Sequence, residues 1–453
     1  MTKTLEQQVI TQITSSAKEK AVIAAIVKEL TKKIKEELTK QNIPATVELV
    51  GSIEKDTYLR HNMDIDLFLV YPPSYKKEKM GKQAIAIGRA LLADTEECYA
   101  EHPYIRGRYK TYKVELVPCY RIEDASEKVS AVDRTPLHTS YIKTHLKEEQ
   151  KQEVRLFKQF LKGIECYGAE AEIEGFSGYL CELVILNYKS FKKSIQQGST
   201  WKYGEHIALS KGPFPSFNTP LVVIDPVDYT RNVASALSLE KFDLFVTACK
   251  AYIKQPKITF FFPNEVTPWT MEKIRKMIRK QNCLYVGIQF LKPDIIDENL
   301  YPQIRKGTRS IQELGERHGF SILDTAYHVD TDQQQITIII KTAKESLPET
   351  LVHRGPPTTL KENMREFKKK WDNDNRVQKG PYEKNGRFFV EIKREYTTFV
   401  DLLRANMPSL SLGKHIGEIM QSQYTILINN ELITKHLQSF WTTYLDGKLP
   451  WER

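Results

Sequence analysis

Apolar residues recur at helical spacing near the start of the chain, with Lys and Glu at the positions between them. The apolar positions include Val22, Ile23, Ile26, Leu30 and Ile34. Residues 4–42 therefore predict one or two amphipathic helices, because one face of a helix returns every three to four residues. We expect these helices to pack against a sheet.

Short apolar runs of strand length follow, at residues 45–50, 64–70 and 112–118. Residues 104–120 as a whole predict two strands that are joined near Lys110. Residues 77–99 return to helical spacing, with the apolar positions Ile85, Ile87, Leu91 and Leu92. This mixture predicts a first domain of helices and strands that closes near residue 148.

The middle of the chain is dominated by helical patterns. Residues 148–164 predict one helix, and residues 175–191 predict another that is almost entirely apolar. We expect the second helix to be the spine of a central helical domain, with Phe176, Leu180 and Leu183 in its core. Gly, Pro and Ser concentrate over residues 201–220, which predicts a loop.

From residue 257 the pattern changes again. Residues 258–263, 270–280 and 285–290 predict a strand, a helix and a strand, an arrangement typical of small α/β RNA-binding modules. Further strands are predicted at 321–329, 335–340 and 388–392, and further helices at 300–318 and from Phe399 onward. The chain is thus predicted to be an α+β multidomain protein with domains at 1–148, 149–256 and 257–453.

Two carboxylates open the strand predicted at 64–70. Successive side chains of a strand point to opposite faces, so Asp64 and Asp66 share one face. Carboxylates that close raise one another's pKa unless a cation lies between them, and hard oxygen ligands suit Mg²⁺. Because an Asp-x-Asp pair also occurs at solvated strand ends, the neighbouring motifs decide between the two interpretations.

Two neighbouring motifs favour a catalytic site. Gly51 and Ser52 end the strand at 45–50, where Gly lets a phosphate approach the backbone and Ser supplies a hydroxyl beside free amides at a predicted helix start. Glu115 is the one acidic residue of the strand at 112–118, and it becomes a third carboxylate if that strand pairs beside the Asp strand. Three carboxylates, two Mg²⁺ ions and a triphosphate cradle are the parts needed for in-line displacement at a nucleotide's α-phosphate.

The amino-acid composition excludes only a few classes of protein. The 453 residues are 41% hydrophobic, and the net charge of +10 favours a polyanionic partner. No apolar run approaches the ~20 residues of a membrane span, and no secretory signal opens the chain, so we expect a cytoplasmic protein with no membrane partner. The six cysteines are scattered without a CxxC pair, which indicates neither a zinc site nor a disulfide framework. We expect most of them to be buried thiols.

The order of the motifs resembles a known superfamily. Gly-Ser, then Asp-x-Asp, then an acidic strand is similar to the nucleotidyltransferases that include DNA polymerase beta and the poly(A) polymerases. The segments Val117–Tyr120, Ser130–His138, Tyr167–Glu170, Gly175–Leu183 and Asp225–Ala234 resemble, more closely, the archaeal class I CCA-adding enzymes. That resemblance implies a polymerase-beta-like nucleotidyltransferase head, a central helical nucleotide-binding domain, and a C-terminal α/β tRNA-binding body and tail.

The resemblance also implies what the site residues do. The activity would be template-independent addition of C, C and A to the 3′ end of tRNA from CTP and ATP, by two-metal-ion transfer. Asp64, Asp66 and Glu115 would bind the metals. The nucleotide would be bound by Ser52, Lys55, Thr135, His138, Lys158, Tyr167, Asp228 and Arg231. Within that set Arg231 would read the base, with Asp228 helping to hold it. Relatives also suggest a homodimer.

Basic residues in the last third of the chain are candidates for contacts with the acceptor and T arms of tRNA. They are Arg305, Lys306 and Arg309 in one predicted helix and Lys369 and Lys370 beside Trp371. Lysines interleaved with aromatic residues suit phosphate contacts plus stacking on RNA. A solvated charged face accounts for each of these clusters about equally well.

Two positions depart from the family pattern. Relatives often have Asp where this chain has Glu115, and the extra methylene could shift a metal or the base role. Some relatives have Arg where this chain has Lys55, which would bind phosphate as a point charge and not as a fork. Two alternatives remain: a poly(A) polymerase or oligoadenylate-type synthetase, against which the Arg231 motif argues, and a noncatalytic RNA-binding protein, against which the intact carboxylates argue.

Overall fold

The computed structural model describes residues 3–99, 102–343, 346–421 and 423–453. The chain divides into two compact units, one of Met1–Glu265 with Leu449–Arg453 and one of Val266–Lys448. The boundary between the units thus lies near the predicted one at residue 256. The finer division into three domains, at residues 148 and 256, stays a prediction.

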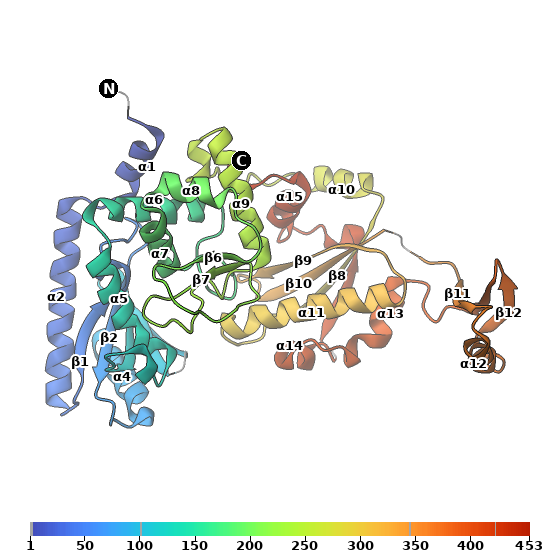
Figure 1. Ribbon diagram of the computed structural model, residues 1–453, viewed down its shortest axis with the longest axis horizontal. Coiled ribbons are helices and arrows are strands. Elements are labelled where there is room, and N and C mark those ends of the chain that lie inside the picture. Colours follow the sequence, from blue (N-terminus) through green and yellow to red (C-terminus); the bar gives the residue numbers. More distant parts are fainter. Residues whose placement is uncertain (1–2, 100–101, 344–345, 422) are drawn as a thin grey trace. The chain divides into compact units, whose positions relative to one another are not determined.

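The first unit contains a five-stranded sheet in the order β1-β2-β5-β4-β3 (Figure 1). The strands are β1 (Thr46–Val50), β2 (Asp64–Tyr71), β3 (Ala93–Tyr99), β4 (Pro103–Tyr109) and β5 (Tyr112–Tyr120). β2 runs parallel to β5, and the other pairs are antiparallel. The predicted pairing of the Asp strand with the Glu115 strand is therefore confirmed.

One face of this sheet is covered by two helices, α2 (Ala17–Lys40) and α4 (Lys77–Leu91). Ile26, Leu30 and Ile34 of α2 share a buried core with Ile65 and Leu67 of β2. The predicted packing on a sheet is thus confirmed for α2, whereas Val9 and Ile13 of the first helix, α1 (Leu5–Ile13), lie in the core of the helical part. Because side chains alternate along a strand, this packing turns Asp64 and Asp66 to the opposite face, where Phe68 and Val70 of the same strand belong to a smaller buried cluster.

The prediction of helix over residues 77–99 was wrong for its last part. Helix α4 ends at Leu91, and Ala93–Tyr99 forms the edge strand β3, which pairs with β4. Nearly every residue of β3 is exposed. An edge strand of this kind carries no apolar alternation, because neither of its faces is buried, and its conformation comes from pairing with its neighbour.

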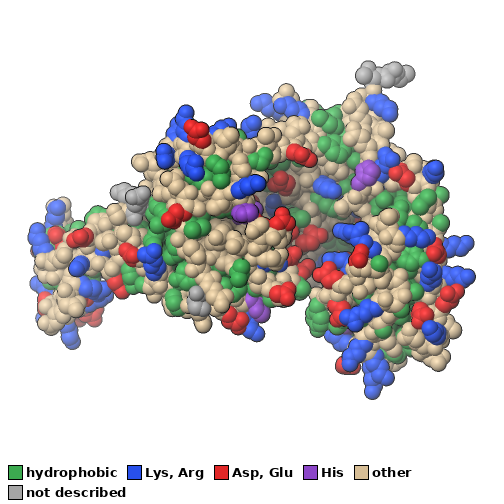
Figure 2. Space-filling view, turned by 180° about the vertical axis from the view of Figure 1, so that it is seen from behind, with side chains coloured by type: hydrophobic (Ala, Val, Ile, Leu, Met, Phe, Trp, Pro, Cys, Tyr) green, Lys and Arg blue, Asp and Glu red, His purple; other side chains and the backbone are tan. Residues whose placement is uncertain are grey.

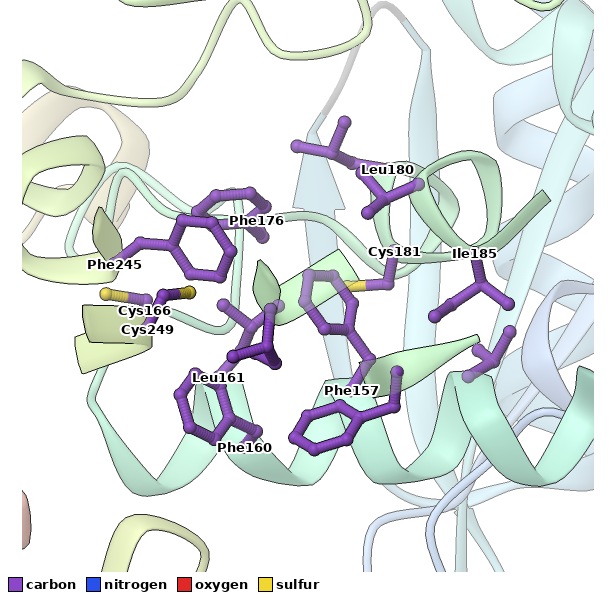
Figure 3. Packing of buried hydrophobic residues seen from close by; sticks show 14 of the residues in the cluster. Phe157, Phe160, Leu161, Cys166, Phe176, Leu180, Cys181, Ile185, Phe245 and Cys249 are labelled. Carbon is purple, nitrogen blue, oxygen red and sulfur yellow. The ribbon is translucent and has the colours of Figure 1, made fainter. Parts of the chain in front are cut away.

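The rest of the first unit is a helical core. Its helices are α1 (Leu5–Ile13), α5 (Arg134–His145), α6 (Glu148–Gly163), α7 (Gly178–Tyr188), α8 (Phe191–Gly198) and α9 (Leu239–Lys254), with two short strands, β6 (Glu205–Ile207) and β7 (Leu221–Val223). Figure 3 shows Phe157, Phe176 and Phe245 packing together from different segments. Phe176, Leu180 and Leu183 are fully buried, as predicted. Lys189 has a left-handed backbone (φ 73°) and separates α7 from α8.

A second prediction was wrong at residues 258–263. Ile258–Phe260 forms a single 3-10 turn and pairs with no strand. Phe260 and Phe261 instead pack their rings against Phe160 of α6, and Phe260 stacks on Trp451 at 5.2 Å. The apolar run is thus core packing between a loop and helices, which a short apolar pattern does not distinguish from a buried strand.

The second unit contains an antiparallel sheet in the order β14-β8-β10-β9. The strands are β8 (Leu284–Leu291), β9 (Ile322–Asp330), β10 (Gln335–Thr342) and β14 (Tyr424–Ile428). Figure 1 shows α10 (Met271–Lys280) and α15 (Gln438–Asp446) on one side of it, and α11 (Asp297–Arg317), α13 (Phe399–Asn406) and α14 (Lys414–Ile419) on the other. The predicted helices and paired strands of this region are confirmed.

A smaller sheet completes the second unit, in the order β11-β13-β12. Its strands are β11 (Thr350–Pro357), β12 (Val377–Lys384) and β13 (Arg387–Lys393), and α12 (Lys361–Trp371) packs on it through Trp371. Among the described residues no helix is long and apolar enough to cross a membrane. Four of the six cysteines are buried and none is disulfide-bonded.

Candidate active site

The turn between β1 and the short helix α3 (Gly51–Glu54) lies directly against a carboxylate. Gly51 has a φ of +72°, and a Cβ atom added there would lie only 2.0 Å from Oδ2 of Asp66. Both the backbone angle and the space therefore require glycine at this position. The close approach that the sequence suggested for a phosphate is made, in this structure, by the side chain of Asp66.

Asp66 and Glu115 are direct neighbours across the parallel strands β2 and β5. Burial, together with the charges of Glu115 and Asp64, raises the pKa of Asp66 to about 7. The three predicted carboxylates are therefore close enough to repel one another. A pocket of about 250 Å³ opens beside Asp66 and Glu115, and Gly51 and Thr135 also line it.

Glu115 has a cationic partner that the sequence analysis missed. Its Oε1 accepts a hydrogen bond of 2.8 Å from Nε of Arg106, the residue opposite it on β4. No group of three or more His, Cys, Asp and Glu side chains among the described residues is arranged to hold one ion in common. The pair Asp64 and Asp66 still fits Mg²⁺, which proteins commonly bind through one or two carboxylates together with substrate phosphates.

A buried carboxylate, Glu182 of α7, organises the predicted triphosphate residues. Its Oε2 accepts a 2.6 Å hydrogen bond from Nζ of Lys55, and its Oε1 accepts one of 2.6 Å from the hydroxyl of Thr57. Lys158 Nζ lies 3.4 Å from the same carboxylate and donates to the Thr57 hydroxyl at 3.1 Å. We call these four residues the Glu182 cluster. It contains two cations and one anion, which leaves an excess positive charge.

The pKa shifts in the Glu182 cluster reflect this mutual support. Burial alone would raise the pKa of Glu182, but Lys55 and Lys158 hold it below its usual value. Burial lowers the pKa of Lys158, and Glu182 opposes that shift. Tyr167 and Lys158 both reach the same glycine, Gly178. A Cβ atom added there would lie 3.3 Å from the Tyr167 hydroxyl and 3.5 Å from Lys158 Nζ. Lys158 and Tyr167 thus converge on one point, as their predicted role requires.

A second carboxylate, Asp225, organises the residues predicted to meet the base. Its Oδ2 lies 2.9 Å from Nε2 of His138 and accepts a 2.9 Å hydrogen bond from Nη1 of Arg231. Its Oδ1 accepts one of 3.1 Å from the hydroxyl of Tyr179, whose ring stacks on His138 at 4.1 Å. We call these four residues the Asp225 cluster. Burial would raise the pKa of Asp225, but the bond from His138 holds it below its usual value.

Asp228 does not hold the side chain of Arg231, contrary to the prediction. Its carboxylate instead pairs with Lys128 at 2.6 Å and with Arg134 at 2.8 Å. Its only bond to Arg231 is through the main chain, where the Arg231 amide donates to the Asp228 carbonyl at 2.9 Å. Asp225 takes the predicted place because the turn at 225–231 returns the chain to the end of β7, which brings Asp225 beside the guanidinium.

Both clusters lie in the first unit, and Lys55 links them because its Nζ lies 5.8 Å from the ring centre of Tyr179. Ser52 is next to Gly51, and its carbonyl accepts from the Thr57 amide at 2.9 Å. Glu182 could have been found in the sequence as the one acidic residue of an otherwise apolar helix. Asp225 lies in the family-like segment Asp225–Ala234, but no feature of the sequence distinguished it from Asp228.

The predicted RNA-binding residues are spread over the second unit. Lys306 and Arg309 are exposed on α11, and Arg305 beside them is half-buried. Lys369 and Lys370 are exposed on α12, with Lys370 Nζ 5.2 Å from the ring centre of Trp371. Figure 2 shows Lys and Arg side chains interspersed with Asp and Glu over the visible face. The distribution of charged side chains over this face therefore does not identify one RNA-binding surface.

Three family models match successive parts of the chain. They are a nucleotidyltransferase domain at residues 31–138, the second domain of tRNA nucleotidyltransferase at 152–262, and the C-terminal domain of CCA-adding enzymes at 281–429. Among solved structures, Cid1 poly(U) polymerase with Mg and 3′-dATP bound aligns with a TM-score of 0.44, at 16% identity over 55% of this chain and 92% of that chain.

Curated relatives match nearly the whole chain. The CCA-adding enzyme of Methanosarcina barkeri is 34% identical over 429 residues, which cover 94% of each chain. That of Methanosarcina mazei is 33% identical over 96% of each chain, and that of Archaeoglobus fulgidus is 34% identical over 84% of this chain and 86% of its own. Enzymes of the nucleotidyltransferase family generally use divalent metal ions, which agrees with the carboxylates of β2. This chain belongs to the CCA-adding enzyme family of tRNA nucleotidyltransferases.

Proposed function

We propose that this protein adds C, C and A to the 3′ end of tRNA without a nucleic-acid template, using CTP and ATP. The observation that carries the proposal is the arrangement of Asp66 and Glu115 side by side, against Gly51 and near the cationic Glu182 cluster. Membership of the CCA-adding family supports the choice of tRNA as acceptor.

The reaction is a displacement at the α-phosphorus of the incoming nucleotide. The 3′ hydroxyl oxygen of the tRNA forms the new bond to phosphorus, its proton is lost, and the bond to the β-phosphate oxygen breaks so that pyrophosphate leaves. Two Mg²⁺ ions, held by Asp64, Asp66 and Glu115, would lower the hydroxyl's pKa and neutralise charge on the phosphate. Glu115 would have to release its hydrogen bond from Arg106 to act as a metal ligand.

The protein supplies position and fixed charge. The triphosphate would be bound by Lys55, Lys158, Tyr167 and the Ser52 hydroxyl. The excess positive charge of the Glu182 cluster would stabilise the negative charge that develops on the leaving pyrophosphate. Both lysines are fixed before the nucleotide arrives, because Glu182 and Thr57 hold them. Little reorganisation is then needed during the reaction.

Selection of C and A would rest on Arg231, supported by His138, while Thr135 would contact the nucleotide from the pocket beside Asp66. A guanidinium has five donors, and Asp225 accepts through one nitrogen, Nη1, so that the rest of the fork remains for a base edge. Cytosine and adenine both present an exocyclic amine beside a ring-nitrogen acceptor, and uracil and guanine reverse that pattern. One arrangement of donors and acceptors therefore accepts both correct bases, and the growing RNA end chooses between them.

Further parts of the proposal concern partners. The second unit would hold the acceptor and T arms of tRNA, and the sequence offers two candidate surfaces for this, Lys306 and Arg309 on α11 and Lys369 and Lys370 on α12. The protein would act in the cytoplasm as a homodimer, as its relatives suggest.

Replacing the central carboxylate tests the proposal. Asp66→Ala should abolish nucleotide incorporation onto tRNA, because it removes the ligand nearest Gly51, and should leave the Kd for tRNA unchanged. Asp94→Ala is the matched control, since Asp94 is an exposed residue of the edge strand β3. Incorporation by the Asp66→Ala variant at the wild-type rate would overturn the assignment of the site.

A further inference from the structure

Helix α10 of the second unit is rich in basic residues, none of which was among the RNA-binding residues predicted from the sequence. Its ten residues contain five Lys or Arg and one Glu. Helix α11, which carries the predicted RNA-binding residues Arg305, Lys306 and Arg309, has four basic and four acidic residues among twenty-one. The positive charge of α10 is thus uncompensated on its own helix, and that of α11 is balanced.

Four of the basic residues of α10 form one stripe on its solvent side. Ile274 and Ile278 are buried in the core shared with Tyr285 and Trp441, so the helix is anchored through that face. Arg275, Lys276, Arg279 and Lys280 are all exposed. Residues four apart lie one above the other on a helix, about 6 Å apart along its axis. We call these four residues the α10 stripe.

None of the four residues of the α10 stripe forms an ion pair with another described residue. By contrast, Lys273 on the same helix lies over the ring of Trp269, at 3.7 Å from its centre. Exposed cations without counter-charges keep their hydration and their full attraction for a polyanion. This arrangement suits the phosphates of a nucleic acid, because each neutralised phosphate also releases a condensed counterion.

A polar pocket adjoins the C-terminal end of the stripe. Its described part has a volume of about 650 Å³ and is lined by Arg279, Asn282, Cys283, Asn429 and Asn430, among others. Asn429 is fixed there, because its Oδ1 accepts from the Tyr285 amide at 2.9 Å. Amide side chains beside an arginine can both donate to phosphate and bond ribose hydroxyls, which distinguishes RNA from DNA.

The α10 stripe and the basic residues of α11 lie on opposite faces of the sheet. Ile339 of β10 belongs to the core under α10, whereas Ile338 faces Gly307 of α11 at 3.8 Å from a Cβ added there. Adjacent residues of a strand point to opposite faces, so the two helices present their charges on opposite sides of the sheet. The two surfaces are therefore alternatives that an experiment can separate.

We propose that the α10 stripe, with the pocket at its end, is the surface of the second unit that binds the phosphate backbone of the tRNA acceptor-arm duplex. The proposal rests on the proposed function, because it takes tRNA as the substrate. A-form RNA is recognised mainly through its shape, phosphates and 2′ hydroxyls, and a rigid line of cations ending in a hydrogen-bonding pocket meets those requirements without reading sequence.

The test compares two charge-neutralised variants of the full-length protein. One carries Arg275→Gln, Lys276→Gln, Arg279→Gln and Lys280→Gln, since Gln preserves helix propensity. The matched control carries Lys306→Gln and Arg309→Gln on α11. The Kd for a tRNA that lacks its CCA end is measured across salt concentrations. Incorporation of CTP at saturating tRNA is measured in parallel, and thermal unfolding checks the fold.

The stripe variant should bind tRNA about 10- to 100-fold more weakly at 0.1 M salt, and the slope of log Kd against log salt should fall by about 2 to 4, roughly one for each lost phosphate contact. CTP incorporation at saturating tRNA should stay near the wild-type rate, because the stripe is not in the catalytic unit. The α11 control should change the Kd only a few-fold.

An unchanged Kd and salt slope in the stripe variant would overturn the inference and would leave an acidic protein as the partner of this surface. If the fourfold variant unfolds, the pair Lys276→Gln and Lys280→Gln gives the same test with half the expected change in slope. Failure of the proposed function is distinct, because there the wild-type protein itself would incorporate no CTP onto tRNA.

Discussion

The Glu182 cluster and the Asp225 cluster are built on the same principle and differ in their access to solvent. Each centres on a fully buried carboxylate that accepts hydrogen bonds from basic side chains. In the Glu182 cluster the cations are buried as well, with Lys55 8% and Lys158 2% exposed. In the Asp225 cluster the side chain of Arg231 is 32% exposed.

This difference fits two kinds of recognition. A triphosphate is bound mainly through electrostatic attraction. Buried cations that are already in position interact with it strongly, because little water screens them. A base edge is met by directed hydrogen bonds, which need a guanidinium that is oriented but still open on one side. The comparison predicts that damage to the Glu182 cluster weakens binding of every nucleotide, and that damage to the Asp225 cluster changes the choice among nucleotides.

The largest expected effect comes from the turn at Gly51, which packs directly on the Asp66 carboxylate. Gly51→Ala should reduce kcat for CTP and ATP about 10²-fold or more, because the new Cβ displaces the Asp66 carboxylate and a misplacement of about 1 Å can cost that much. Single-turnover incorporation onto tRNA measures this loss. Gly204→Ala is the control, since a Cβ at Gly204, also at positive φ, meets no atom within 4 Å. Equal rates for both variants would contradict the close packing of Gly51 on Asp66.

Glu182→Gln should destabilise the protein by about 3–5 kcal/mol, because it leaves two buried lysines without a counter-charge. In the wild-type protein the pKa of Glu182 is lowered, so its contribution to stability is present above the ordinary carboxylate pKa of about 4.3 and is lost as the pH falls further. Unfolding in urea measures the change, with the exposed Glu172→Gln as control.

Glu182→Gln should also change the kinetics of nucleotide use. KM should rise by a similar factor, about 10-fold or more, for CTP and for ATP, because the loosened lysines bind the triphosphate that both share. The ratio of kcat/KM values for correct and incorrect nucleotides should stay unchanged. A shift in that ratio would mean that the two clusters do not divide their tasks as described.

Arg231→Ala should instead change the discrimination among nucleotides. Discrimination of CTP and ATP against UTP and GTP should fall by about 10- to 100-fold, the value of one or two lost hydrogen bonds to a base edge. Asp225→Asn should change discrimination in the same direction but less, because Tyr179 and His138 still orient the pocket. Discrimination that survives both substitutions would remove Arg231 from base selection.

The smallest effect is expected from Asp228→Asn. The Asp228 carboxylate pairs with Lys128 and Arg134 and not with the Arg231 side chain, so the ratio of kcat/KM values for ATP and UTP should change less than about threefold, within the range of a substitution away from the reacting groups. A loss of discrimination as large as that of Arg231→Ala would instead restore the role that the sequence suggested for Asp228.

The fold was predictable where burial imposed a period on the sequence. Strand β2 is an apolar run of strand length that Asp64 and Asp66 open, so the sequence placed both carboxylates on one face, and the acidic residue of the neighbouring β5 identified Glu115. Strand β3 was missed because it is exposed at a sheet edge, and the turn at Ile258–Phe260 was taken for a strand because aromatic core packing gives the same apolar run.

Within the site, the sequence located the residues but not their partners. Arg106, Glu182 and Asp225 each complete an ion pair with a predicted residue, and each comes from a different segment of the chain. Local patterns carry no information about such long-range pairs. Family motifs placed Asp225 and Asp228 in one segment, and only the path of the turn shows which carboxylate reaches Arg231.

The most direct test of the account is nucleotide incorporation by the wild-type protein with Mg²⁺. Each of the four nucleotides, separately and together, is offered to tRNA that ends before CCA, to tRNA that ends in C and to tRNA that ends in CC. If the proposed function is right, the protein makes two additions of C, one addition of A and then stops, with ATP used only after CC. Long tails of A would contradict it in favour of a poly(A) polymerase, and tight tRNA binding without any incorporation would contradict the catalytic assignment altogether.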